Sequence, residues 1–142
     1  MIFFSGTDAN VFIQLFGDKG KTGEYKLDSS SNDFERGQTD EFSVEALDIG
    51  IVQRIRIGHD NAGLGSAWFL ESVNIEDTLN MKVYEFIVKQ WFDSHHGDKQ
   101  IEREITPETT PGSDIVNYKI TLKTMDLRGA GNSLFFFFSF YL

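Results

Sequence analysis

Hydrophobic and polar residues alternate along most of this chain, in short runs separated by glycine, asparagine, aspartate and serine. The clearest run covers residues 40–47, where Phe42, Val44 and Ala46 alternate with polar positions. A period of two residues is the pattern of a half-buried β-strand. No stretch long enough for a surface helix, about 12 residues, carries a helical period. The pattern therefore predicts an all-β protein.

About eight strands are expected, at intervals of roughly 8 to 12 residues. They are predicted at residues 9–16, 24–27, 40–47, 51–58, from 68 onward, and at 81–88, 101–105 and 116–125. Such spacing fits an antiparallel sandwich or barrel, and we favour the sandwich, with its loops gathered at the two ends. In the strand that begins at residue 68, the core-facing set is expected to be Phe69, Val73 and Ile75, and the solvent-facing set Glu71, Ser72 and Asn74.

A polar, glycine-rich loop at residues 58–67 runs directly into an apolar segment that starts with Trp68. Its glycines allow tight bends, and Asp60 and Asn61 place oxygen atoms at its tip. We expect Trp68 to be a buried anchor. His59 is predicted to be a packed corner residue that hydrogen-bonds the loop, whereas His95 and His96 are expected in a solvated loop, at residues 93–99.

Composition narrows the class of protein. The 142 residues, of which 40% are hydrophobic, are enough for one packed domain. The net charge of −9 argues against nucleic-acid binding and against simple adhesion to anionic lipid. The chain has no cysteine, which excludes a disulfide scaffold and fits an intracellular, reducing compartment. The apolar segment 134–142 is too short to cross a bilayer as a helix, which takes about 20 residues.

Catalysis is not indicated by the sequence. It contains no nucleophile elbow, no phosphate-binding loop, no cysteine and only three histidines. Loop carboxylates such as Asp8 and Asp33 lack an apolar pocket of the kind that general acid or base catalysis requires. We therefore expect a protein that is not an enzyme.

Four segments carry a resemblance to a known family. They are residues 5–12 (SGTDANVF), 32–40 (NDFERGQTD), 59–70 (HDN through WFL) and 84–92 (YEF and WF). Together they resemble the PLAT domain, the module of polycystins, lipoxygenases and alpha-toxin that is also called the lipoxygenase homology domain. The resemblance covers about residues 5 to 105 and is closest to tandem-repeat PLAT proteins. It implies an antiparallel β-sandwich of two four-stranded sheets.

One strand of the family pattern is displaced in this chain. The strand that opens a PLAT domain is missing before Ser5, but residues 118–131 resemble that strand and its connector. The expected organisation is a sandwich at 1–106 without its usual first strand, a linker at 107–115, and a first strand with an apolar tail at 116–142. This strand either closes its own sandwich or completes a neighbouring molecule by strand exchange, as in a homo-oligomer. We favour closure within the chain.

Calcium is the cofactor that the resemblance implies. Calcium prefers oxygen ligands from carboxylates, amides and backbone carbonyls on loops. The matching positions are the backbone carbonyls of Gly6 and Thr7, the side chains of Asp8, Asn32, Asp33 and Glu35, and, as weaker matches, Asp60 and Asn61. The alternative is that these side chains satisfy their own backbone in turns, and that Glu35 forms an ordinary solvated pair with Arg36.

Membrane contact is the second activity that the resemblance implies. Relatives attached to lipid enzymes insert apolar side chains from the calcium-side loops. The matching residues are Phe3, Phe4, Leu64 and Trp91. The alternative is that Trp91 caps the core and the two phenylalanines fill a gap.

Two functions therefore remain open. The first is a non-catalytic adaptor or scaffold unit that binds a protein partner, and the alternative is a calcium-dependent domain that binds membrane lipid. Acidic charge without a basic lipid patch places the adaptor slightly ahead. Tandem-repeat relatives point to an intracellular site near membranes, in a cell projection such as a cilium.

Overall fold

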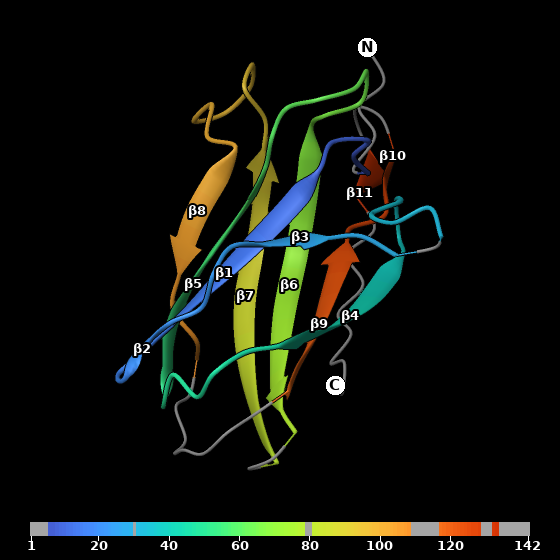
Figure 1. Ribbon diagram of the computed structural model, residues 1–142. Coiled ribbons are helices and arrows are strands. Elements are labelled where there is room, and N and C mark those ends of the chain that lie inside the picture. Colours follow the sequence, from blue (N-terminus) through green and yellow to red (C-terminus); the bar gives the residue numbers. More distant parts are fainter. Residues whose placement is uncertain (1–5, 30, 79–80, 109–116, 129–131, 134–142) are drawn as a thin grey trace.

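The computed structural model describes residues 6–29, 31–78, 81–108, 117–128 and 132–133 (Figure 1). The described residues contain no helix, and eleven strands follow one another along the chain. They are β1 (Val11–Gly17), β2 (Gly20–Lys21), β3 (Tyr25–Leu27), β4 (Thr39–Glu45), β5 (Val52–His59), β6 (Trp68–Asp77), β7 (Lys82–Phe92), β8 (Glu102–Ile105), β9 (Asn117–Thr124), β10 (Leu127–Arg128) and β11 (Asn132–Ser133). The predicted all-β, antiparallel sandwich is confirmed.

One sheet has the strand order β2-β1-β5-β8, with β3 also paired to β1. The β1 strand pairs with β5 along one edge, and β2 and β3 share the other edge, β2 near Phe16 and β3 near Val11. This sheet is therefore only four strands wide, because β2 and β3 lie end to end.

The second sheet has the order β4-β9-β6-β7. In it β9 pairs with β4 from Thr39↔Lys123 to Glu45↔Asn117 and with β6 on its other side. The strand that resembles the opening strand of a PLAT domain therefore lies in the middle of its own chain's sheet. The boundaries predicted for the linker and the tail stay a prediction.

The core lies between the two sheets. It is built by alternate residues of both, as a period of two requires. The fully buried members include Val11, Ile13, Leu15, Ile55, Ile57, Val73, Ile75, Phe86, Ile120 and Leu122. Burying each of these side chains contributes about 1.5 to 3 kcal/mol to folding.

The predicted facing of β6 is wrong at its start. The pairing with β7 and β9 shifts between Leu70 and Ser72, so Glu71 forms a β-bulge. The bulge moves Leu70, rather than Phe69, into the core. Glu71, Ser72 and Asn74 are also buried, although solvent exposure was predicted for them.

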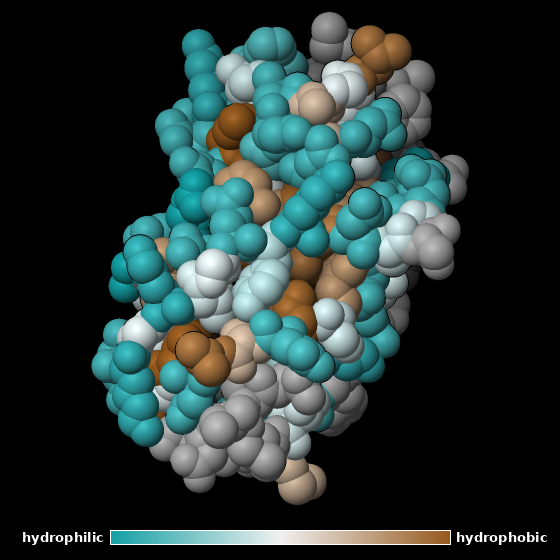
Figure 2. All heavy atoms as spheres, viewed as in Figure 1, coloured by the Kyte–Doolittle hydropathy of each residue, from teal (hydrophilic) through white to brown (hydrophobic). Residues whose placement is uncertain are grey.

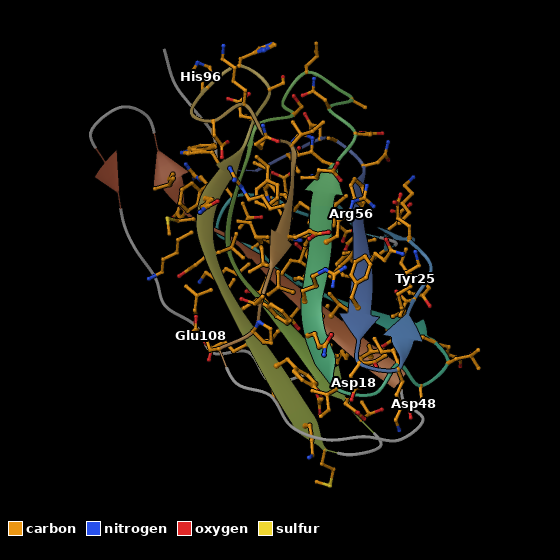
Figure 3. The ribbon with its side chains drawn as sticks, turned by 90° about the vertical axis from the view of Figure 1, so that its left-hand side faces the viewer. Asp18, Tyr25, Asp48, Arg56, His96 and Glu108 are labelled. Atoms are coloured by element: carbon orange, nitrogen blue, oxygen red, sulfur yellow. The ribbon has the colours of Figure 1, made fainter. Side chains whose placement is uncertain are left out.

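The β7 strand is longer than predicted, since it continues through Trp91 to Phe92. The loop after β7 carries His96 at one end of the molecule, and Asp18 and Asp48 lie at the other (Figure 3). Because β5 runs between the two ends, the loop before it and the loop after it are far apart. Within the described residues, no helix is long and apolar enough to span a bilayer.

Candidate calcium-binding loops

Residues 6–8 form a short segment held between two loops. On one side the backbone N–H of Thr7 donates to the carbonyl of Phe34 (3.1 Å), and on the other the N–H of Asp8 donates to the carbonyl of Gly65 (2.9 Å). The hydroxyl of Thr7 also donates to the carbonyl of Ser66 (2.9 Å). The segment therefore connects the loop at residues 32–38 to the glycine-rich loop through hydrogen bonds.

Glycine is required in this segment and in the loop beside it. A Cβ atom on Gly6 would lie 3.0 Å from both the nitrogen of Arg36 and the carbonyl oxygen of Phe34. Gly63 has a φ of +80°, and a Cβ atom there would lie 3.1 Å from the Cβ of Asp8. The close approach of the three backbone segments depends on these two positions.

A cleft of about 400 Å³ opens where these segments meet, and its lining residues are Gly6, Thr7, Asp8, Glu35, Arg36 and Gly65. Four of them belong to the predicted calcium set. Asp8 is exposed, and its carboxylate accepts no hydrogen bond from the described residues. Arg36, which lines the same cleft, forms an ion pair with Asp126 (2.9 Å). Asp8 and Glu35 therefore face one small cleft.

Asn32 and Asp33 are occupied within their own loop. The Asp33 carboxylate accepts hydrogen bonds from the backbone N–H of Ser29 (2.7 Å) and from the hydroxyl groups of Ser29 (2.6 Å) and Ser31 (3.3 Å). The amide of Asn32 donates to Oε1 of Glu35 (2.6 Å). Asp33 therefore stabilises its own loop in this structure, and calcium binding by Asn32 and Asp33 stays a prediction.

Asp60 and Asn61 also serve the glycine-rich loop. The Asp60 carboxylate accepts the side-chain amide (2.6 Å) and the backbone N–H (3.0 Å) of Asn10, together with the N–H of Ala62 (3.0 Å). The hydrogen bond from the Asn10 side chain, followed by that from Ala62, lowers the pKa of Asp60. Oδ1 of Asn61 accepts from Ser66 (2.9 Å) and Ser94 (3.2 Å). Both side chains tie the loop to its neighbours.

The buried Asp40 anchors the loop at residues 32–38. Its carboxylate is buried and accepts the N–H of Phe34 (2.9 Å) and the side-chain amide of Gln38. Burial raises the pKa of Asp40, against the lowering effect of these hydrogen bonds. Phe34 itself has a φ of +62° and is only 4% exposed. A buried side chain and a buried acceptor therefore keep Glu35 in place.

His59 is the packed corner residue that was predicted. It is 1% exposed, its Nδ1 accepts the N–H of Asn61 (2.9 Å), and its Nε2 lies 2.8 Å from the carbonyl oxygen of Phe92. With Nδ1 accepting, Nε2 carries the proton and donates to Phe92. Burial lowers the pKa of His59, which favours the neutral imidazole. Trp68 is buried as predicted.

His95 and His96 are exposed, as expected. Nδ1 of His96 nevertheless lies 2.6 Å from Oδ2 of the buried Asp93. This contact shapes the loop at residues 93–99.

Leu64 is the most exposed large hydrophobic residue among the described positions, at 106%. A cavity of about 440 Å³ lies beside it, lined in part by Asn61, Ser66, His95 and His96. This cavity shares Gly6 and Gly65 with the Asp8 cleft, so the apolar tip and the carboxylates are neighbours. An exposed leucine next to an acidic cleft is the arrangement that membrane contact through ordered loops would need.

Of the other three predicted lipid contacts, one lies in a strand and two lie outside the described residues. Trp91 lies in β7, is half-buried, and packs edge-on against Phe69 with ring centroids 5.2 Å apart. Phe3 and Phe4 lie outside the described residues, as does the apolar tail. The contact of Trp91 with lipid stays a prediction.

The donor set fits calcium in part. Two carboxylates, of Asp8 and Glu35, and the backbone carbonyls of Gly6 and Thr7 are hard oxygen donors of the kind that calcium takes. The described residues contain no group of three or more acidic or histidine side chains arranged to hold a metal. A calcium ion here would therefore complete its usual 6 to 8 ligands with water or lipid oxygens.

Two features of the site were not foreseen from the sequence. Gly65 and Arg36 line the cleft, and Asn10 is the partner that occupies Asp60. Contacts between segments about 50 residues apart leave no local pattern in the sequence. The one available signal is the pair of glycines that flank Leu64.

The fold and the loops at this end define the chain as a PLAT/LH2 domain. The match to this family covers residues 2–105, so the chain belongs to it.

Among its relatives are the lipoxygenase homology domain-containing protein 1 of Mus musculus and of Homo sapiens. Each is 40% identical over 130 residues, which cover 89% of this chain but only 6% of the relative. The chain thus spans a small fraction of these proteins. Human polycystin-1 is 34% identical and covers 71% of this chain, which in turn covers 2% of polycystin-1.

Solved structures of lipoxygenases share the fold. A coral 8R-lipoxygenase, described as activated by calcium via a C2-like domain, aligns with a TM-score of 0.64 and 31% identity. The alignment covers 72% of this chain and 15% of the coral chain. A second lipoxygenase structure, of the Delta413-417:GS I805A variant, aligns with a TM-score of 0.62 and 30% identity, over 72% of this chain and 14% of that one.

Proposed function

We propose that this domain is a non-catalytic interaction module whose loops at residues 6–8, 34–36 and 60–67 bind a lipid surface in response to calcium. The observation that carries the proposal is the shared cleft of Asp8 and Glu35, with the exposed Leu64 beside it. The coral lipoxygenase, which has a related domain, is described as calcium-activated.

Calcium would act at this site by changing charge. Asp8 and Glu35 bring two negative charges to the end of the molecule that carries Leu64, in a chain of net charge −9. Anionic lipid headgroups are repelled by such a surface. A divalent cation held by the two carboxylates and the carbonyls of Gly6 and Thr7 would cancel the local charge. Leu64 could then enter the membrane interface without bringing unpaired carboxylates close to the headgroups.

Vesicle co-sedimentation tests the proposal, with phosphatidylserine and phosphatidylcholine vesicles in the presence of calcium or a chelator. The wild-type chain is expected to sediment with calcium only. Asp8→Asn is expected to lose the response, because it removes a carboxylate that has no other partner among the described residues. Asp33→Asn is the matched control, since Asp33 is engaged by Ser29 and Ser31. Equal sedimentation of the wild-type chain with calcium and with chelator would contradict the proposal.

A second function, that of a protein-binding adaptor, is favoured by a separate observation. The outer edge of β4 has no strand partner among the described residues. The match covers only 6% of the length of the relative from Mus musculus, which supports a role for this domain as one binding unit among many. The two functions separate in a chelator, where lipid binding is expected to be lost and protein binding retained.

A further inference from the structure

Apart from the two-stranded sheet of β10 and β11, the two sheets of the sandwich end in four strand edges, and three of these edges carry a feature that hinders pairing. In the first sheet, one edge is divided between β2, of two residues, and β3, of three. The other edge is β8, of four residues, where Glu102 and Glu104 pair with Arg56 and Arg54 of β5. Very short edge strands are a usual protection against adding a further strand.

The third edge, β7, is closed by contacts and by a bulge. The carbonyl of Glu85 accepts the N–H of Glu108 (2.9 Å), and the carbonyl of Trp91 accepts the guanidinium of Arg103 (2.8 Å). Between them the pairing with β6 is broken, and Lys89 has a φ of +48°. A bulged strand does not present a regular row of backbone groups.

The fourth edge, β4, has neither a break nor a bulge. Its seven residues pair with β9 in one continuous register and include no proline, glycine or lysine. At one end the N–H of Thr124 donates to the carbonyl of Gln38 (3.1 Å). Because bonded pairs alternate in an antiparallel ladder, the backbone groups of Glu41 and Ser43 point away from β9. Both residues are exposed.

Within the part of the chain that the structure describes, the unpaired stretch of this edge is bounded at one end. The hydroxyl of Tyr25 donates to the carbonyl of Glu45 (2.9 Å), which shows that this carbonyl also points outward. Thr39, Glu41 and Ser43 remain, enough for a short added strand. The hydrophobic side chains seen in Figure 2 form several small separate patches on a mainly hydrophilic face. On this face an edge is therefore a better docking element than an apolar surface.

Charge distinguishes between the occupants of this edge. A second copy pairing with β4 antiparallel about Ser43 would place Glu41 opposite Glu45 of the other copy, and like charges directly opposite are destabilising. Glu41 has a partner on the sheet, Lys119 at 2.9 Å, whereas Glu45 has no ion pair within the described residues. An added strand with basic side chains at alternate positions would face these carboxylates favourably.

We propose that the outer edge of β4 is a strand-addition site for an extended protein segment that carries lysine or arginine at alternate positions. The inference rests on the adaptor function proposed above and names the class of partner. Backbone hydrogen bonds at Glu41 and Ser43 supply the attachment, and Glu41 and Glu45 select the charge of the partner.

The test uses the full chain in a chelator and a fluorescent peptide that alternates lysine with valine. We expect saturable binding by fluorescence anisotropy, and slower amide hydrogen exchange at Glu41 and Ser43 when the peptide is bound. Ser43→Pro removes an outward N–H but no bond to β9, and is expected to weaken binding by about tenfold or more. Ser43→Thr keeps the N–H and is the matched control, expected to bind like the wild-type chain. A peptide with glutamate in place of lysine is expected to bind at least about tenfold more weakly.

Two outcomes would overturn the inference, and only the second also removes support from the adaptor function. If the lysine peptide binds but slows exchange at β7 or β8 instead of β4, the edge assignment is wrong and the adaptor function stands. If neither peptide binds the wild-type chain, the strand-addition site and its support for the adaptor function both fall. The exchange measurement on the wild-type chain decides the matter even where Ser43→Pro does not fold.

Discussion

Phe34 and Trp68 pack edge-on in the core, with ring centroids 5.6 Å apart. Phe34 belongs to the loop that carries Glu35, and Trp68 directly follows the glycine-rich loop that carries Leu64. The indole N–H of Trp68 donates to the hydroxyl of Thr124 at the end of β9 (2.8 Å). The ring contact therefore joins the two candidate calcium loops to each other, and the hydrogen bond joins them to β9, the strand that completes the second sheet.

Replacing Phe34 should weaken this junction. Phe34→Ala removes a ring that is 4% exposed, so we expect a loss of about 3 to 5 kcal/mol in the free energy of unfolding. Urea denaturation followed by tryptophan fluorescence measures it. Phe12→Ala, at a half-buried position on the outer face of β1, should cost clearly less. Equal losses for the two variants would show that the loop is not anchored through Phe34.

Deleting residues 115–142 should prevent the rest of the chain from folding. The deletion removes β9, which pairs with both β4 and β6, and leaves β4 separated from its sheet. We expect the truncated chain to lose its cooperative thermal transition, and a synthetic peptide of residues 116–126 to restore it. A truncated chain that melts at the wild-type temperature would contradict closure of the sandwich by β9.

Stability should fall with acid because of His59. Burial lowers its pKa in the folded state, below the ordinary value of about 6.5 that it regains on unfolding. Above that value both states are neutral. As pH falls through it, the unfolded chain takes up the proton first, so the free energy of unfolding decreases. Urea denaturation at pH 7.5 and 5.5 should show this loss in the wild-type chain and in His95→Gln, but a smaller loss in His59→Gln.

A buried ion pair in the second sheet gives another prediction. Nζ of Lys123 lies 3.9 Å from Oε2 of Glu71, and both side chains are 3% exposed. Burial raises the pKa of Glu71 and lowers that of Lys123. Lys123→Met alone should destabilise the fold by about 3 to 5 kcal/mol, because it removes the ion-pair partner of a buried carboxylate.

The double variant Glu71→Leu/Lys123→Met should recover most of that loss, because apolar residues can replace a buried pair at little cost. A double-mutant cycle from urea denaturation measures the coupling. Additive losses in the double variant would mean that the two charges do not compensate each other.

Much of the fold could be predicted from the sequence because period-two alternation is a local property. Phe42, Val44, Tyr118, Ile120 and Leu122 alternate with polar residues, and each pattern marks a strand that the structure contains. The bulge at Glu71 could not be predicted in this way. One extra residue turns the side chains of the preceding strand residues to the opposite face of the sheet, and no local composition marks where a bulge occurs.

The candidate site was less predictable than the fold. Residue type alone does not tell a free carboxylate from one that holds its own turn, and Asp8 and Asp33 look alike in the sequence. Only the three-dimensional structure shows that Asp33 is held by Ser29 and Ser31 while Asp8 faces a cleft. The structure therefore separates Asp8, at the cleft, from Asp33, which is engaged in its own loop, and calcium binding by the predicted set stays a prediction.

The most direct test of calcium-dependent lipid contact is to follow the surroundings of residue 64. The chain contains no cysteine, so Leu64→Cys can carry a single environment-sensitive fluorophore. Leu47→Cys is the matched control, because Leu47 is also highly exposed but precedes β5, at the other end of the sandwich. With anionic vesicles, calcium should shift the emission at position 64 to the blue, reversibly with a chelator, and leave position 47 unchanged. No shift at position 64, or the same shift at both positions, would contradict the account.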